Sequence, residues 1–118
     1  MNYAIKHENG ITLIKLFEKI NYEEGKQLLD EIAANYPYQR RLWDMSEITF
    51  DYTMDEIIKI AQYSKKIFTK PNKLAVYTLS DLTYGVIREL EVYREVEGKV
   101  ESRPFRNKQE AIDWLNIC

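Results

Sequence analysis

The sequence predicts an α/β protein with a five-stranded, mostly parallel sheet and four helices. Three observations favour this fold class. Apolar runs with the period of a strand alternate with runs of helical period along the 118 residues. An Asn-Gly pair separates the first two runs, and three of the helical runs begin at Asn or Thr with Glu three positions later. A chain of this length can bury a core of its own, so residues 1–118 are expected to form a single domain.

The first third of the chain predicts a hairpin and a helix. Residues 3–7 and 11–18 have the pattern of strands, joined by a tight turn because Asn and Gly at 9–10 both tolerate positive φ. The helix begins after Asn21 and ends before Pro37, which lacks the backbone N–H that a helix needs. Its predicted buried stripe consists of Tyr22, Gly25, Leu28, Leu29, Ile32 and Tyr36. The glycine in this stripe would let the helix press close to the sheet.

The middle third predicts a strand, a helix and another strand. Residues 41–45 form the first of these strands. The helix begins after Thr53, and Pro71 interrupts it. Its predicted buried stripe consists of Ile57, Ile60, Ala61, Ser64, Ile67 and Phe68. Residues 73–79 are almost continuously apolar, which is typical of a strand that is buried on both faces.

The last third predicts a helix, a strand and a terminal helix. The first helix begins at the Ser-Asp pair 80–81 and ends near Gly98. Its apolar stripe consists of Leu82, Val86, Leu90 and Tyr93. Residues 99–105 form the last strand, and the terminal helix begins after Asn107, where Glu110 completes a capping box.

The connections and the strand compositions together predict the order of the sheet. Helical crossovers imply parallel pairing from the second strand onward. The first strand carries Lys6 and Glu8, and such charges belong at sheet edges. The last strand carries further charges and a proline, namely Lys99, Glu101, Arg103 and Pro104. The expected order is therefore 1-2-3-4-5, with only the first strand antiparallel.

The charge balance argues against a nucleic-acid partner. Lys and Arg number 17 against 19 Asp and Glu, so the formal net charge is −2. Proteins that bind nucleic acids usually collect a basic surplus on one face. The arginine pair at 40–41 and the lysine pair at 65–66 are too short to form such a face.

The cysteine usage and the hydropathy favour a cytoplasmic protein. The one cysteine, Cys118, excludes a disulfide within the chain, which fits a reducing compartment. The start of the sequence has no apolar run of signal-peptide length. No run approaches the length of a membrane span, so no transmembrane segment is expected.

Four features in a fixed order carry a family resemblance. They are the opening hairpin, Asp44 at the end of the third strand, residues 80–88 after the fourth strand, and the closing residues 105–115. This ordered set resembles the small bacterial proteins with the fold of anti-sigma-factor antagonists, called STAS-like or SpoIIAA-like domains. The resemblance implies a sheet flanked by helices that binds a protein or a ligand and has no chemistry of its own.

The antagonist branch of this family is switched by phosphorylation of a serine in an Asp-Ser-Ser-Gly-Leu-Gly motif where the second helix begins. This sequence has Phe-Asp-Tyr-Thr-Met-Asp-Glu at 50–56, so Thr53 is the only residue that could take the phosphoacceptor role. The neighbouring acids Asp51, Asp55 and Glu56 would repel a phosphate there. The departure favours the less characterised SpoIIAA-like side. Some members of the wider fold group are related to lipid-carrying domains, so ligand binding stays open.

The sequence also predicts a group of candidate site residues. The carboxyl ends of parallel strands lie at one rim, where open α/β sheets usually bind ligands. Five residues are expected there: Asp44, Thr53, Ser80, Asp81 and Tyr84. Thr53, Ser80 and Asp81 have an alternative role, which is to satisfy free amides at helix starts. Asp44 ends a buried strand and needs partners, which loop amides could also supply.

Arg88, Glu89 and His7 are further residues of interest. Glu89 falls on the apolar stripe of its helix with Arg88 beside it, which could mark a buried polar pocket. Alternatively, Glu89 extends from the margin of the stripe into solvent. His7 is the one histidine, so a metal site would rest on carboxylates, and no metal or cofactor is expected. Because no nucleophile elbow or phosphate loop occurs, the protein is not expected to be an enzyme.

Two functional hypotheses follow. The first is a non-enzymatic regulatory or protein-interaction module with a flat, tyrosine-bearing apolar patch and no enclosed cavity. The alternative is a binder of a small or lipid-like ligand, in a cavity between sheet and helices lined by apolar groups with Asp44, Glu89 or Arg88. An enzyme ranks third, since it would need several titratable groups converging in a cleft. Nine tyrosines, two apolar-rich helices and an exposed sheet edge are also compatible with a homodimer. Tyrosines expected to be partly exposed are Tyr36, Tyr38, Tyr52 and Tyr63.

Overall fold

The computed structural model describes residues 2–49, 52–68, 72–95 and 100–117. All predicted strands and helices are present. They are β1 (Tyr3–Glu8), β2 (Ile11–Leu16), α1 (Tyr22–Asn35), β3 (Arg40–Asp44), α2 (Met54–Ile67), β4 (Asn72–Tyr77), α3 (Asp81–Glu95), β5 (Val100–Phe105) and α4 (Lys108–Leu115). The predicted helix break at Pro71, the helix end near Gly98, the strand start at Lys99 and the terminal Cys118 lie outside the described residues.

The sheet has the predicted topology. Its strand order is β1-β2-β3-β4-β5, β1 is antiparallel to β2, and the other neighbours are parallel. The turn between β1 and β2 has positive φ at both Asn9 (53°) and Gly10 (80°), as the Asn-Gly pair predicts. The charged strands β1 and β5 are the two edges.

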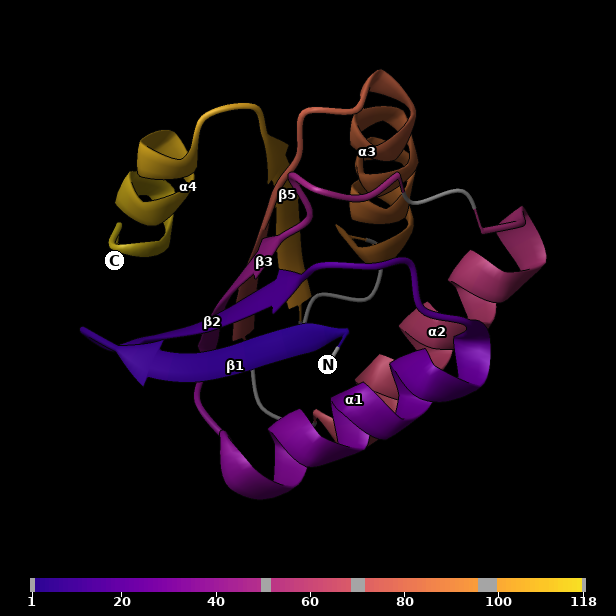
Figure 1. Cartoon of the computed structure of the whole chain (residues 1–118), viewed down its shortest axis with the longest axis horizontal. Coiled ribbons are helices and arrows are strands. Elements are labelled where there is room, and N and C mark those ends of the chain that lie inside the picture. Colours follow the sequence, from indigo (N-terminus) through magenta and orange to yellow (C-terminus); the bar gives the residue numbers. More distant parts are fainter. Residues whose placement is uncertain (1, 50–51, 69–71, 96–99, 118) are drawn as a thin grey trace.

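Helices cover both faces of the sheet (Figure 1). On one face, α1, α2 and α3 pack over a core that includes Ile14, Trp43 and Val76. On the other face, Leu42 and Ala75 of the same strands pack against α4. Successive residues of a strand point to opposite faces, so β3 and β4 supply apolar side chains to both layers.

Capping residues begin the helices where the sequence predicts. Asn21 and Thr53 each form a complete capping box with the glutamate three positions later. The Asn107 side chain accepts a hydrogen bond from the Glu110 backbone N–H at 3.0 Å. Each of these bonds satisfies an amide that has no partner within its own helix.

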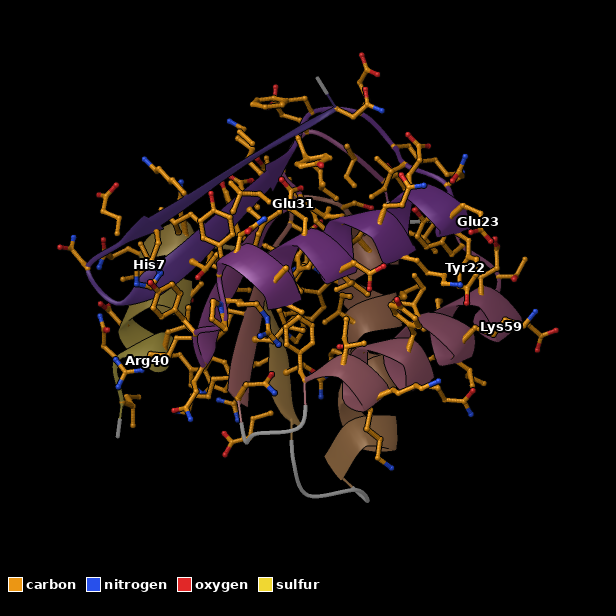
Figure 2. All side chains as sticks on the ribbon, turned by 90° about the horizontal axis from the view of Figure 1, so that it is seen from below. His7, Tyr22, Glu23, Glu31, Arg40 and Lys59 are labelled. Carbon is orange, nitrogen blue, oxygen red and sulfur yellow. The ribbon has the colours of Figure 1, made fainter. Side chains whose placement is uncertain are left out.

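Gly25 permits a close approach, but to a helix and not to the sheet as predicted. A Cβ atom at Gly25 would lie 3.3 Å from Cδ1 of Ile60 on α2, which is tighter than ordinary contact. Figure 2 shows α1 and α2 side by side on this side of the molecule. The sheet is reached by the neighbouring residues Leu28 and Ile32, both fully buried.

The predicted apolar stripe of α3 is wrong in its first turn. Leu82 is 54% exposed, whereas Thr83 and Ile87 are buried. Val86, also in the predicted stripe, is partly buried against Ile57 and Ala61 of α2, and the side chains of Leu90 and Tyr93 lie outside the described residues. The Ser80 hydroxyl accepts the Thr83 N–H at 3.2 Å, and the Ser80 N–H donates to the hydroxyl of Thr78, just after β4. Glu89 is exposed, in agreement with the alternative that it extends from the margin of the stripe into solvent.

Candidate binding groove at the carboxyl rim of the sheet

The carboxyl rim is the border of the sheet where the parallel strands end. The loops that follow β3, β4 and β5 all leave the sheet there, along its upper border in Figure 1. Four candidate residues follow these strands closely: Asp44, Ser80, Asp81 and Tyr84. Their contacts divide them into turn and cap residues on one hand and groove residues on the other.

Asp44 acts within its own loop. It is 7% exposed, and its Oδ1 accepts hydrogen bonds from the Ser46 backbone N–H at 3.0 Å and from the Ser46 hydroxyl at 2.6 Å. Its Oδ2 lies 3.7 Å from the Lys108 ammonium at the start of α4. The carboxylate therefore has the partners that a buried charge requires, and the loop amide supplies one of them.

Thr53 and Ser80 are helix caps. The Thr53 hydroxyl accepts the Glu56 N–H at 3.2 Å and donates to the Glu56 carboxylate at 3.1 Å. Ser80 caps α3 in the same manner. Both residues are held in these roles by bonds within their first helical turn.

Tyr84 and Arg88 lie at a groove between α3, β5 and α4, which we call the arginine groove. Its volume is about 490 Å³. Its lining residues are Tyr84, Arg88, Arg103, Pro104, Phe105, Arg106 and Glu110. Asp81 pairs with one of these arginines, Arg106, and Glu89 does not line the groove. Tyr84 and Arg88 were predicted as site residues, and the structure brings them to one groove. Arg103 and Arg106 were missed as site residues.

The geometry of the elements explains how these side chains converge. Tyr84 and Arg88 are four residues apart on α3, so they lie on the same side of the helix. Arg103 belongs to β5, an edge strand, and Arg106 follows the end of that strand. The sequence contained a signal for this groove, because basic residues stand before and after the end of β5, at Arg103 and Arg106.

Aromatic rings and one carboxylate position two of the three arginines. The Arg106 guanidinium lies 4.5 Å from the centroid of the Tyr84 ring, and its Nη1 is 2.5 Å from Oδ1 of Asp81. The Arg103 guanidinium lies 5.3 Å from the Trp114 ring centroid. Cation–π contacts of this kind hold a guanidinium in place.

The groove carries positive charge on an acidic chain. Three guanidinium groups and the Glu110 carboxylate give the lining a formal charge of +2, or +1 with Asp81, the ion-pair partner of Arg106, whereas the whole chain is at −2. The groove can therefore attract anionic groups that the rest of the surface does not favour.

A second hollow lies between the sheet and the α1–α3 layer. This apolar recess has a volume of about 90 Å³, and its lining includes Leu28, Trp43, Met45, Arg41 and Ser64. The sequence predicts that Asp44, Glu89 or Arg88 would supply its polar groups, and this is wrong, because none of the three lines it. Asp44 is engaged with its loop, and α3 turns the other two residues outward.

Arg41 is a buried arginine that the sequence reasoning missed. It is 2% exposed, and its Nη2 donates to Oδ1 of Asn72 at 2.6 Å. Its guanidinium also lies 4.0 Å from the Phe68 ring centroid and 3.5 Å from the Tyr38 carbonyl oxygen. The alternation of the strand contained the signal, because Arg41 shares a face of the sheet with Trp43.

The His7 ring contacts an aromatic ring and a hydroxyl group. The His7 ring stacks on Tyr38 with centroids 3.7 Å apart, and its Nδ1 is 3.0 Å from the Thr12 hydroxyl. Across residues 2–49, 52–68, 72–95 and 100–117, no three His, Cys, Asp or Glu side chains group as a metal site would require.

Several tyrosines join neighbouring elements by their hydroxyl groups. Tyr3 of β1 donates to Oε2 of Glu31 at 2.7 Å, and Glu31 is labelled on α1 in Figure 2. Tyr63 of α2 donates to Asp30 of α1. These hydrogen bonds to carboxylates, followed by burial, raise the pKa of both phenols, because they favour the protonated form.

The prediction of partly exposed tyrosines is confirmed. Tyr36, Tyr52 and Tyr63 are partly exposed, and Tyr38 is 46% exposed. The Tyr52 hydroxyl donates to the backbone carbonyl of Ile20. The hydroxyl groups of Tyr52 and Tyr63 thus stabilise contacts between elements of the same chain.

Comparison with known proteins defines the fold. No family model matches the sequence, and no curated protein matches it. Among solved structures, a crystal structure of an uncharacterised protein of the DUF3478 family from Shewanella loihica PV-4, described as having a SpoIIAA-like fold, aligns with a TM-score of 0.62. The two sequences are 20% identical, and the alignment covers 96% of this chain and 91% of the other.

The chain is thus an α/β protein with a five-stranded sheet and a polar groove at its carboxyl rim. More particularly, it has the SpoIIAA-like fold, so the resemblance stated from the sequence is confirmed for the fold. In the part of the chain that the structure describes, every helix is too short or too polar to cross a bilayer.

Proposed function

We propose that this protein is a non-enzymatic regulatory or protein-interaction module that binds another protein at its carboxyl rim. One observation carries the proposal. Leu79 and Leu82 are 63% and 54% exposed, and they flank Asp81, the partner of Arg106 in the arginine groove. Exposed apolar side chains next to arginines have the composition of a protein interface. Phe17, 43% exposed, follows β2 at the same rim.

The absence of enzymatic activity is part of this proposal. Near the groove, Asp81 pairs with Arg106 and Asp44 accepts hydrogen bonds from Ser46, whereas Glu110 lines the groove itself beside the arginines. The two phenols with raised pKa values, Tyr3 and Tyr63, belong to β1 and α2 and do not line the groove. These contacts favour recognition over proton transfer. A cytoplasmic location and a bacterial host, expected from the sequence, complete the proposal.

The test is to purify the protein from its own host and weigh it by native mass spectrometry. The expected result is a complex with a second protein at fixed stoichiometry. A double variant, Leu79→Asp with Leu82→Asp, should lose that complex. Ile117→Asp, a matched control at another exposed apolar side chain (59% exposed), should keep it. A mass without any partner protein, or a complex that survives the double variant, contradicts the proposal.

The second candidate function is binding of a small or lipid-like ligand in the apolar recess. Its nearly apolar lining favours this candidate. However, about 90 Å³ is well below the roughly 300–1,000 Å³ of a typical ligand site, so the recess would have to widen. The same mass spectrum distinguishes the candidates. A bound small ligand adds roughly a few hundred daltons to the mass of the chain, whereas a homodimer doubles that mass.

A further inference from the structure

We infer that the arginine groove binds the carboxylate groups of an acidic protein segment. This inference rests on the proposed function and deepens it, because it names the chemistry of the partner. Arg88 and Arg106 would pair with aspartate or glutamate side chains of the segment, and Arg103 would add positive charge beside them. Leu79 and Leu82 would contact apolar residues next to those acids.

The guanidinium groups match carboxylates in shape, and they reach the groove from two different elements. A guanidinium presents its N–H groups in a planar fork that matches the two oxygens of a carboxylate. Arg88 reaches the groove from α3, whereas Arg103 and Arg106 reach it from β5 and the turn after it. Groups from two elements can contact an extended segment from both sides. Arg88 is exposed, so an incoming carboxylate can reach it.

The bracing of Arg106 and Arg103 lowers the cost of ordering them. Arg106 is held by Tyr84 and Asp81, and Arg103 by Trp114. A side chain that is already ordered loses less rotamer entropy when it binds. Asp81 occupies one side of the Arg106 fork, and a partner carboxylate would take the other.

The charge and the walls of the groove favour a protein segment over a nucleic acid. A chain at −2 repels a polyanion over long range, and the groove itself carries only +2, with Glu110 opposing a dense anion. Its walls include Pro104, Phe105 and Tyr84, which offer contact area to carbon atoms. A volume of about 490 Å³ fits a few residues of a peptide.

The first experiment selects peptides without presupposing their sequence. The full chain is used to select binders from a display library of random peptides, in parallel with the double variant Arg88→Gln with Arg106→Gln. Peptides enriched by the natural chain should contain Asp or Glu next to apolar residues, and the variant should not enrich them. A selection without acidic enrichment, or the same peptides selected by the variant, would overturn the inference.

The second experiment measures affinity with one enriched peptide and its amide counterpart, in which Asn and Gln replace Asp and Glu. The acidic peptide should bind at least about tenfold more tightly, and the arginine variant should lose about tenfold or more in affinity. The matched control, Lys59→Gln with Lys66→Gln on α2, removes the same charge from exposed positions outside the groove and should bind normally. Equal binding of both peptides contradicts the inference.

Competition separates other anions from a carboxylate segment. The bound peptide is displaced with inorganic phosphate, with single-stranded DNA or with a glutamate-rich peptide. If phosphate or DNA displaces it at a lower concentration than the glutamate-rich peptide does, the groove binds phosphates and the inference is overturned. The proposed function has a separate outcome. If the native complex is lost in the Leu79→Asp, Leu82→Asp variant and survives in the arginine variant, the interaction module stands and the groove chemistry fails.

Discussion

The two ends of the sheet use arginine in opposite ways. At the start of β3, Arg41 is 2% exposed and its guanidinium contacts Asn72 and the Phe68 ring. At the carboxyl rim, Arg88 and Arg106 are exposed around a groove of about 490 Å³. Because all of these residues are arginines, residue type alone does not decide whether such a side chain stabilises the fold or stays available to a ligand. Its position in the fold and its partners decide this.

The energetic reason lies in hydration. A buried guanidinium loses its water, so it must find acceptors and ring faces inside the protein. An exposed guanidinium keeps its water and exchanges it only when a ligand arrives. Substitution of Arg41 should therefore change the free energy of unfolding, and substitution of the rim arginines should change the affinity for a ligand.

The largest expected effect is that of Arg41→Ala. The substitution leaves the Asn72 side chain without its 2.6 Å partner and uncovers the Phe68 ring, so the free energy of unfolding should fall by on the order of 3 kcal/mol. Urea unfolding measures it. Arg88→Ala at the rim is the control and should change stability by less than about 0.5 kcal/mol. Similar losses in the two variants would break the comparison.

A smaller effect is expected at Thr53, the one residue that could take the family's phosphoacceptor role, which the structure shows as a helix cap. Thr53→Ala removes the acceptor of the Glu56 N–H and should lower the free energy of unfolding by about 1 kcal/mol. Thr53→Ser keeps the acceptor and should retain most of the stability. If Thr53→Ala is neutral in thermal unfolding, the cap does not explain this residue.

Ser102 offers a test within the same row of the sheet as Arg41. Leu74 pairs with both of them in register, so Ser102 and Arg41 lie on the same face. The Ser102 hydroxyl is buried and has no hydrogen-bond partner among the described residues. Ser102→Ala should therefore raise the free energy of unfolding by up to about 1 kcal/mol. A destabilised variant in chemical unfolding would indicate a partner for this hydroxyl.

The smallest expected effect concerns Tyr3 and depends on pH. Its folded pKa is raised above the unfolded value by the hydrogen bond to Glu31, so this stabilisation is fully present below the unfolded pKa of about 10 and is lost as the pH rises through the folded pKa. Tyr3→Phe should be less stable by about 0.5 kcal/mol at neutral pH, and the difference should vanish in strong alkali.

The control for this pH dependence is Tyr38→Phe, which removes an exposed hydroxyl and keeps the ring that stacks on His7. Its stability difference from the natural chain should not share the alkaline loss seen for Tyr3. Unfolding followed at neutral and alkaline pH compares the two variants directly.

Much of the fold could be predicted because its signals are local or compositional. The Asn9-Gly10 turn, the Asn21 and Thr53 capping boxes and the charged edge strands each depend on neighbouring residues or on one strand. The buried side of the first turn of α3 could not be predicted from apolar residues alone. Leu82 is more apolar than Thr83, but the cap at Ser80 turns the threonine inward.

The candidate site was predicted only in part, for a related reason. Tyr84 was identified because it follows β4 at the rim, and Arg88 because it lies beside Glu89 on α3. Arg103 was interpreted as an edge-strand charge and Arg41 was given no role, since a charged side chain does not itself reveal which neighbours surround it. Their roles depend on Trp114 in one case and Asn72 in the other, contacts between residues that are far apart in the sequence.

The position of Trp114 has a practical consequence. Its ring lies between the ammonium of Lys73, 4.9 Å from its centroid, and the guanidinium of Arg103. The other tryptophan, Trp43, is 9% exposed within the core. A molecule that enters the groove and shifts Arg103 alters the electric field at one indole and leaves the other unchanged. The native chain therefore carries its own optical reporter, and titrations can be followed by emission without any attached dye.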